Sequence, residues 1–265
     1  MEHKTVSIRQ TNKGLMDMKR FFISFLVFAL LLPAFSCLSE RGEIVIYNNL
    51  VGKDAFPLKG FKIGIDPGHQ EKGNAELEIS MPGTYEKKAK VASGTRGTTT
   101  GIPEYVTVLE ISLQLRDLLE ALGAEVLMTR ETHDVDISNQ ERAIMMNEWG
   151  ADLVLRMHCN GSTDPFVSGM GMYVRMTGAC YQESYQLAQS LLKHMIEATG
   201  AKKAGIFQRN TYTGLNWSEV PSVLVEMGYM TNPDEDVKLN SAEYQEKLVI
   251  GALNGILEFL NVSLD

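Results

Sequence analysis

The stretch Phe61–His69, FKIGIDPGH, is the part of the sequence that decides the fold. Its first six residues, Phe61–Asp66, have the aromatic and β-branched content that is typical of a buried strand. Pro67 and Gly68 end this strand, and a histidine follows directly. Further along the chain, strand-like and helix-like segments alternate, and this alternation predicts an α/β fold.

The pattern after this first strand predicts four helices and four more strands. The helix at Glu104–Leu122 carries an apolar residue at every third or fourth position, and Gly123 follows it as a stop. Another helix begins with the capping box Ser138–Glu141 and reaches Trp149. The other predicted elements are helices at Gln182–Thr199 and Ala242–Leu260, and strands at Glu125–Thr129, Asp152–Met157, Met170–Met176 and Ser222–Met227.

The segment Gln70–Pro103 differs from the rest, because it is rich in Gly, Thr, Lys and Glu and shows no periodicity. It opens directly after His69 and closes at the residue before Glu104. We expect an irregular loop there. A loop of this length inside a compact domain is usually functional or disordered.

Composition and charge exclude several classes of protein. The 265 residues are 44% hydrophobic, 8% aromatic and 22% charged, which excludes collagen-like, low-complexity and wholly disordered chains. The formal net charge is −8, although the first 36 residues by themselves carry a net positive charge. The remainder is more acidic still and would repel phosphate backbones, so we expect no nucleic-acid partner.

The N-terminal sequence predicts export. Lys19-Arg20 precedes Phe21–Phe35, an uncharged run that is too short for a typical membrane span and suits the core of a signal peptide. Small residues lie just before Cys37, the position at which a bacterial lipoprotein is cut and acylated. We therefore predict a signal peptide or N-terminal anchor at residues 1–36 and a polar tether at 37–60. Lipidation of Cys37, plain secretion and an uncleaved anchor all stay open.

Two histidines have a setting that suits chemistry. His69 follows the first strand, and His158 stands at the C-terminal tip of the strand at Asp152–Met157. Open α/β sheets bind ligands outside the carboxyl ends of their strands, so we expect the two imidazoles to face one crevice. A structural role is the alternative for each. His133, in a polar turn, and His194, inside a helix, lack such a setting.

Two carboxylates complete a possible site. Glu226 follows three aliphatic residues of a predicted buried strand, so its charge needs a partner and we expect its pKa to rise toward that of a general base. An N-cap or a salt bridge is the structural alternative for this residue. Glu104 begins a helix, where the dipole favours negative charge in any case. A βα connection would nevertheless bring Glu104 above the strand tips. Two neutral imidazoles and one carboxylate are the ligand set of a catalytic zinc, and a second carboxylate would take a proton from water.

A cysteine hydrolase is the competing chemistry for this crevice. Cys159 follows His158, and a thiol mechanism needs both side chains within hydrogen-bond reach. Neighbouring residues on a strand point to opposite faces, so we expect Cys159 to face away from His158 as a small buried residue. Cys37, Cys159 and Cys180 are too few for a disulfide framework, and a Cys159–Cys180 pair stays open.

Several segments together resemble the zinc-dependent N-acetylmuramoyl-L-alanine amidases of bacterial cell walls, in order and spacing from about Lys62 to Phe259. The segments that carry the resemblance are Gly64–His69, Pro103–Tyr105 with the helix after it, Met128–Arg130, Arg156–Asn160 and Val223–Tyr229, together with Leu215–Ser218 and Thr231–Pro233. The resemblance implies a single catalytic domain at residues 61–262. It also implies a twisted, mostly parallel sheet of about six strands flanked by helices.

The same resemblance implies the roles of the four site residues. His69, Glu104 and His158 would bind Zn²⁺, and Glu226 would be the catalytic acid/base. The substrate would be peptidoglycan, cut at the amide between N-acetylmuramic acid and L-alanine, in the cell wall or at the extracellular face. The chain departs from the family pattern at Gln70-Glu71, where Gly-Gly is usual, at Tyr105–Val108, where acidic and polar residues are usual, and in the length of Gln70–Pro103.

Two other readings of the same crevice remain open. One is a different zinc hydrolase of the wall, either a peptidase or a deacetylase, which would release a different amine. The other is a non-catalytic wall-binding lipoprotein, held at the membrane through its N-terminus. The presence of Glu226 and of both histidines argues against this second reading.

Overall fold

The structure is a computed structural model, and it describes residues 56–178 and 180–264. The predicted signal peptide or anchor at residues 1–36, Cys37 and most of the predicted tether at 37–60 lie outside the described residues. Among the helices that are described, none has both the length and the apolar character needed to cross a membrane.

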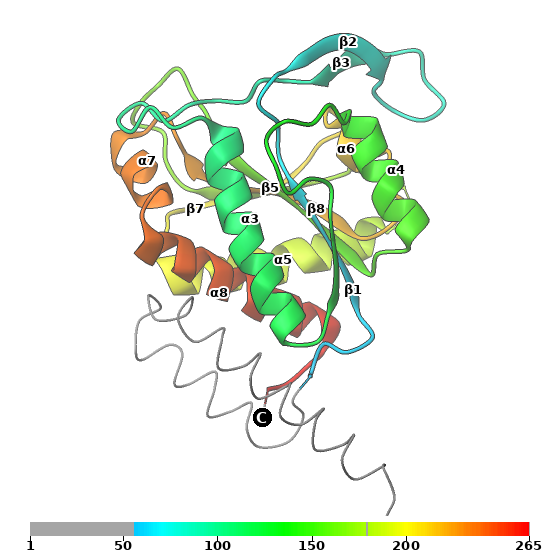
Figure 1. Ribbon diagram of the computed structural model, residues 1–265, viewed down its shortest axis with the longest axis vertical. Coiled ribbons are helices and arrows are strands. Elements are labelled where there is room, and N and C mark those ends of the chain that lie inside the picture. Colours follow the sequence, from blue (N-terminus) through cyan, green and yellow to red (C-terminus); the bar gives the residue numbers. More distant parts are fainter. Residues whose placement is uncertain (1–55, 179, 265) are drawn as a thin grey trace, which may run out of the picture. The chain divides into compact units, whose positions relative to one another are not determined.

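A six-stranded sheet forms the centre of the fold (Figure 1). Its strand order is β4-β1-β5-β8-β6-β7. The neighbouring strands β4, β1, β5 and β8 run parallel to one another. Strand β6 is antiparallel to β8, and β7 is parallel to β6. The α/β class and the mostly parallel sheet are therefore confirmed. The strands are β1 (Lys62–Pro67), β4 (Glu125–Met128), β5 (Leu153–Asn160), β6 (Met170–Val174), β7 (Lys203–Gln208) and β8 (Ser222–Tyr229).

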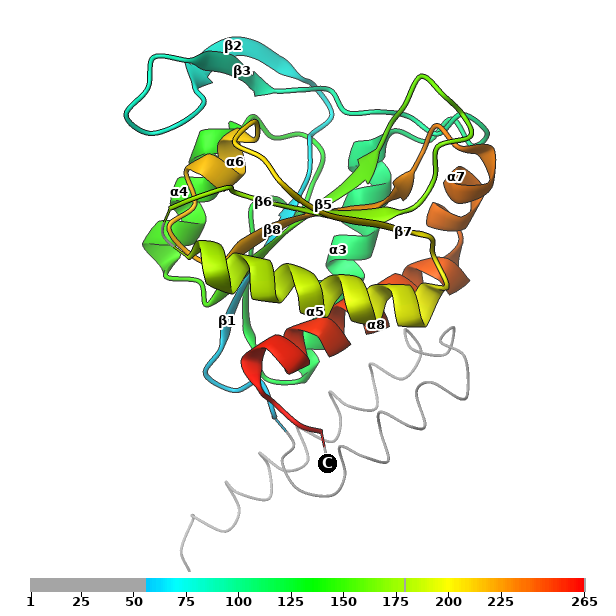
Figure 2. The same ribbon diagram turned by 180° about the vertical axis from the view of Figure 1, so that it is seen from behind.

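Helices cover both faces of this sheet. On one face, α3 (Glu104–Ala121), α5 (Tyr181–Thr199) and α8 (Ala242–Leu260) pack with the strands into the main apolar core. Helices α5 and α8 lie side by side in both views (Figures 1 and 2). The other face carries α4 (Asn139–Trp149), whose Met146 packs against Val154, and the short α6 (Thr213–Asn216). Side chains at alternate positions of β5 and β8 therefore enter different layers.

The predicted elements mostly appear with bounds shifted by one or two residues. At α4, the Ser138 hydroxyl accepts from the Glu141 amide at 3.2 Å, and the Glu141 carboxylate accepts from the Ser138 amide at 2.8 Å. This reciprocal pair satisfies two amides that a helix start leaves free, and Gly150 ends the helix in a left-handed conformation. The predicted capping box is thus confirmed.

The expectation of an irregular loop at Gln70–Pro103 is wrong. This segment contains an antiparallel hairpin of β2 (Asn74–Ile79) and β3 (Lys87–Val91), apart from the main sheet (Figures 1 and 2). The sequence hides it because the usual burial pattern is inverted. Leu77 is 61% exposed, whereas Glu78 is buried and accepts from the Gln140 amide at the start of α4.

Three elements of the fold were not predicted from the sequence: β7, α6 and α7 (Pro233–Leu239). Strand β7 lies at the edge of the sheet, and its residues are exposed or half-buried, so it carries no run of buried apolar residues. Helices α6 and α7 are too short for an apolar stripe. The start of α7 is marked by a cap rather than by an apolar stripe. The N-cap residue Asn232 accepts hydrogen bonds from the Asp234 and Glu235 amides, and Pro233 is the first residue of the helix.

Candidate metal centre

His69 leaves the end of β1 in a left-handed backbone conformation, with φ of 60°. Its Nδ1 lies 2.7 Å from the carbonyl oxygen of Ala92, just after β3. A carbonyl only accepts, so Nδ1 carries the hydrogen and the neutral ring keeps a lone pair on Nε2. Burial lowers the pKa of His69, but hydrogen bonding to Glu104 and its charge outweigh this and raise the pKa above its ordinary value.

Glu104 is the first residue of α3 and is 2% exposed. Its Oε1 accepts from the Cys159 amide at 3.0 Å, and its Oε2 accepts from the Thr95 amide at 2.9 Å. Burial raises the pKa of this carboxyl, yet the two neighbouring histidines lower it well below its usual range. Glu104 is therefore an ionised, fixed carboxylate in the interior.

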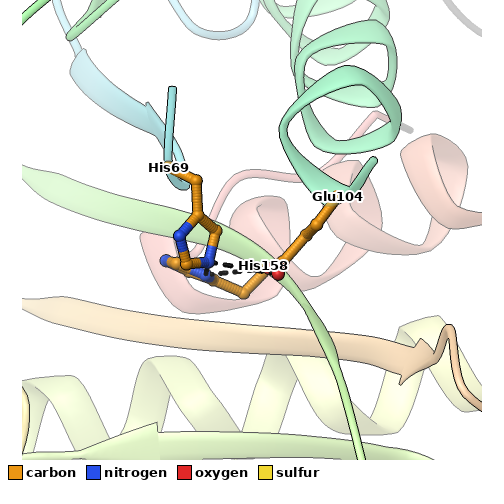
Figure 3. A group of neighbouring side chains, drawn as sticks. All are labelled: His69, Glu104 and His158. Atoms are coloured by element: carbon orange, nitrogen blue, oxygen red, sulfur yellow. Dashed lines mark hydrogen bonds and ion pairs between the residues drawn. The ribbon is translucent and has the colours of Figure 1, made fainter. Parts of the chain in front are cut away.

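His158 lies near the C-terminal end of β5 and contacts both other side chains (Figure 3). Its Nδ1 is 3.2 Å from His69 Nε2 and 3.2 Å from Glu104 Oε1. The two rings meet edge to face, with centroids 4.8 Å apart. Burial lowers the pKa of His158, which favours the neutral imidazole that can act as a ligand.

Two glycines allow the three side chains to come this close. A Cβ on Gly68 would overlap the His158 ring. A Cβ on Gly94, which has φ of 78°, would lie 2.9 Å from both Glu104 Oε2 and His69 Cγ. The backbone at these positions therefore packs directly against the side chains of the cluster.

The spacing of the donor atoms, which are two imidazole nitrogens and the two oxygens of the Glu104 carboxylate, fits a zinc ion. His69 Nε2 lies 3.1 Å from Glu104 Oε2, and the two contacts of His158 Nδ1 are each 3.2 Å. Zn–N and Zn–O bonds of about 2.0–2.1 Å in tetrahedral geometry place neighbouring ligand atoms about 3.3 Å apart. These three residues form the only group of at least three potential metal ligands found among residues 56–178 and 180–264. The predicted meeting of His69, Glu104 and His158 is thus observed.

Glu226 lies on β8 directly opposite His158 in the parallel register. It is 8% exposed, and its Oε2 is buried without a hydrogen-bond partner among the described residues. Burial raises the pKa of Glu226 well above its ordinary value, and the charge of Glu104 raises it further. The salt bridge considered as its alternative role is absent from the described part of the chain. A buried carboxyl with a raised pKa therefore lies on the strand next to that of His158.

A buried ionic network behind His69 was not anticipated from the sequence. Asp66 pairs with Arg142 at 2.8 Å and with Arg156 at 2.5 Å, and these arginines keep the pKa of Asp66 very low although its burial raises it. Arg142 also donates to the His69 carbonyl oxygen at 3.0 Å and to Gln70 Oε1 at 3.1 Å. This network fixes the backbone that carries His69. The signal that could have indicated it is a charged residue inside each of two apolar strand runs, Asp66 and Arg156.

The departure from the family pattern at Gln70 has a structural role. Gln70 is 1% exposed, its Nε2 donates to Asp136 at 3.2 Å, and its Oε1 accepts from the Ile137 amide at 3.2 Å. A Gly-Gly sequence has no side chain to make these contacts. The residue therefore ties the His69 turn to the chain that leads into α4.

The remaining candidate residues lie elsewhere. Cys159 has its thiol in the main apolar core, burial raises its pKa well above the ordinary value, and both Cys159 and Cys180 are free thiols. This agrees with a buried packing role rather than with a nucleophile. His133 stacks edge to face on Tyr105, and His194 pairs with Glu197 and Glu258.

Comparisons with known proteins agree with this arrangement. The sequence model of the family Amidase_3, described as N-acetylmuramoyl-L-alanine amidase, matches residues 63–258. The chain is 31% identical over 216 residues to the N-acetylmuramoyl-L-alanine amidase Rv3717 of Mycobacterium tuberculosis, covering 77% of this chain and 88% of that protein. It is 26% identical to the germination-specific N-acetylmuramoyl-L-alanine amidase of Bacillus subtilis, covering 77% and 82%.

Two solved structures show the same fold. The N-acetylmuramyl-L-alanine amidase Ami1 of Mycobacterium smegmatis superimposes with a TM-score of 0.71 at 26% identity, covering 77% of this chain and 98% of that one. The catalytic domain of CwlV from Bacillus (Paenibacillus) polymyxa superimposes with a TM-score of 0.63 at 24% identity and covers 77% and 99%. The described domain therefore corresponds to almost the whole of both solved chains.

Proposed function

Since this chain belongs to the Amidase_3 family of N-acetylmuramoyl-L-alanine amidases, we propose that it cleaves peptidoglycan with the help of a zinc ion. The bond cut is the amide between N-acetylmuramic acid and L-alanine. His69, Glu104 and His158 bind the ion in this proposal. The observation that carries it is the convergence of His69 Nε2, His158 Nδ1 and the Glu104 carboxylate at spacings of 3.1–3.2 Å.

The donor set is suited to zinc by its chemistry as well as its spacing. Two imidazoles and one carboxylate leave a fourth tetrahedral position open, as catalytic zinc sites do. The Ala92 carbonyl orients His69, and the Thr95 and Cys159 amides orient Glu104. Hydrogen bonds of this kind to metal ligands typically change metal affinity by about 10–100-fold.

Glu226 is proposed as the catalytic acid/base. A bound zinc ion supplies Lewis acidity, which acidifies water and polarises the scissile carbonyl. Glu226, with its raised pKa, accepts a proton from the attacking water and then donates it to the departing nitrogen of L-alanine. Its unpartnered Oε2 leaves the carboxyl free of competing hydrogen bonds. Such a general acid/base contributes about 10²–10⁴-fold to the rate.

The test is a digest of purified peptidoglycan by the full chain, with zinc and after chelation, analysed by mass spectrometry. We expect zinc-dependent release of stem peptides that begin with a free L-alanine amine. New amines on D-residues would instead identify a peptidase, and new amines on glucosamine would identify a deacetylase. Wall binding without any released fragment would identify a non-catalytic binding protein. A zinc-free wild type that is fully active after chelation would refute the metal role.

Cleavage of peptidoglycan implies action outside the cytoplasm, and we propose residues 1–36 as the export signal or anchor, followed by the tether at 37–60. In this proposal the catalytic domain spans residues 61–262, and Cys37 is the attachment point if the chain is lipidated. Labelling cells with a palmitate analogue tests this, with Cys37→Ala as the control. Label that persists in the Cys37→Ala protein would contradict attachment at Cys37.

A further inference from the structure

Three aromatic side chains form a half-exposed surface beside Glu226, on the face of the sheet opposite the main core. They are Tyr173 of β6, Phe207 of β7 and Tyr212, which directly precedes α6. The rings of Tyr173 and Phe207 are stacked with centroids 5.0 Å apart, and Tyr212 meets Tyr173 edge to face at 5.2 Å. We refer to these three residues as the aromatic wall.

The strand register places the wall next to Glu226. Glu226 of β8 lies opposite Gly171 of β6, and Gly171 lies opposite Gly205 of β7. Neither glycine has a side chain to separate the wall from Glu226. The Phe207 ring lies over both, because a Cβ would be 3.3 Å from it at Gly171 and 3.7 Å from it at Gly205.

Arg209 adds a positive charge to the wall. Its guanidinium carbon is 5.9 Å from the centroid of the Phe207 ring, within the range of a cation–π contact. The side chain is exposed, and within the described residues it pairs with no carboxylate; Nη1 donates to the Gln208 carbonyl at 2.9 Å. A free cation held over an aromatic ring is a typical anchor for an anionic ligand.

The wall also connects Arg209 to Glu226 electrostatically. Burial and then the charge of Glu226 raise the pKa of both Tyr173 and Tyr212, whereas the charge of Arg209 acts to lower each pKa. Both tyrosines therefore lie within the fields of the two groups. A ligand that extends from Glu226 along the wall ends at a cation.

The direction of the substrate follows from the proposed role of Glu226, so this step rests on the proposed function. Glu226 donates its proton to the nitrogen of L-alanine, so the stem peptide begins beside Glu226, and the glycines at 171 and 205 leave the path from there to Phe207 free of side chains. Phe207 lies two strands across the sheet and two residues along β7 from the position of Glu226. These two displacements together amount to a distance of about 12 Å. An extended peptide advances about 3.3–3.6 Å per residue, so the third or fourth stem residue reaches the wall's far end.

We propose that Arg209, held over Phe207 in the aromatic wall, binds a carboxylate on the third or fourth residue of the stem peptide. The stem peptide carries free carboxylates, whereas the neighbouring glycan has lost the lactyl carboxylate to the scissile amide. The charge of Arg209 therefore matches the peptide arm rather than the sugar arm. Arg209 is a specificity-determining residue in this assignment, and it takes no part in proton transfer.

The test compares two soluble substrates on the full, zinc-loaded chain. The short one is N-acetylmuramoyl-L-alanine amide, which is too short to reach the aromatic wall. The long one carries a stem tetrapeptide with free carboxylates on its third and fourth residues. We expect Arg209→Glu to raise KM for the long substrate about tenfold at nearly unchanged kcat, since a charge-assisted hydrogen bond is lost. KM for the short substrate should stay within about twofold, and Arg209→Lys should restore part of the effect.

A matched control is Lys247→Glu, the same charge reversal at an exposed side chain of α8, a helix that packs on the opposite face of the sheet. It should leave both KM values unchanged. An equal change of KM on both substrates, or none on the long one, would overturn the assignment to the peptide. A change that appears only when the short substrate is extended by a second sugar would place the glycan at the wall instead. A wild type that cleaves neither substrate contradicts the proposed function itself.

Discussion

Substituting Gly94 by alanine should separate the geometry of the proposed zinc site from the stability of the domain. The new Cβ would lie 2.9 Å from Glu104 Oε2 and from His69 Cγ, whereas ordinary contacts begin at 3.4 Å. The two side chains must therefore move by about 0.5 Å, more than the roughly 0.2 Å that metal–ligand distances tolerate. We expect zinc affinity to fall about 10–100-fold, which corresponds to about 1.4–2.8 kcal/mol.

Gly83 provides the matched control. It has φ of 76°, close to the 78° of Gly94, but a Cβ there meets nothing within 4 Å. Backbone strain should cost both Gly83→Ala and Gly94→Ala about 1–2 kcal/mol of unfolding free energy without metal, because a left-handed backbone is strained for alanine. In Gly94→Ala alone, the close contacts of the new Cβ add to this loss. Zinc competition against a coloured chelator and urea unfolding of the metal-free proteins measure the two effects. Equal zinc affinity in the two variants would refute our account of the site.

Three further outcomes are expected. Glu226→Gln should keep its zinc, by elemental analysis, while turnover of peptidoglycan falls about 10²–10⁴-fold; unchanged turnover would exclude the acid/base role. Asp66→Asn leaves two buried arginines unpaired and should cost about 3–5 kcal/mol in urea unfolding at pH 7. The folded-state pKa of Asp66 lies below its unfolded value, so the stabilisation by this carboxylate is complete above about pH 4 and is lost as the pH falls further. The unfolding free energies of the wild type and of Asp66→Asn should therefore converge in acid. A difference that stays constant with pH would argue against the ion pairs. Cys159→Ala should retain turnover and lose about 1 kcal/mol of stability, and an inactive but folded variant would reopen the thiol mechanism.

Elements whose local signals agree with their burial were predictable from the sequence. The capping box at Ser138 indicated helix α4, and apolar stripes indicated α3 and α8. The hairpin and β7 were not predictable, because their stability comes from contacts with other parts of the fold. In β2, Glu78 is buried since the start of α4 supplies amides to its carboxylate, while Leu77 faces outward.

The hairpin shows why this matters for the site. It leads directly into the segment that contacts the histidine and the carboxylate: Ala92 orients His69, and Thr95 donates to Glu104. Asn216 and Trp217 hold the other end of the hairpin through the Ser80 and Ile79 carbonyls, at 2.9 Å and 2.8 Å. A segment interpreted as irregular therefore supplies hydrogen bonds to two of the three proposed metal ligands.

The sequence alone determined which residue types could carry chemistry and at which strand and helix ends they stand, because periodicity and capping act over a few neighbouring residues. Tertiary structure decided which atoms meet. His69 turns Nε2 inward because a carbonyl 23 residues away takes the hydrogen on Nδ1. Glu226 has a raised pKa because strands distant in sequence bury it beside Glu104. Tautomer and pKa depend on distance and dielectric, which only the folded chain defines.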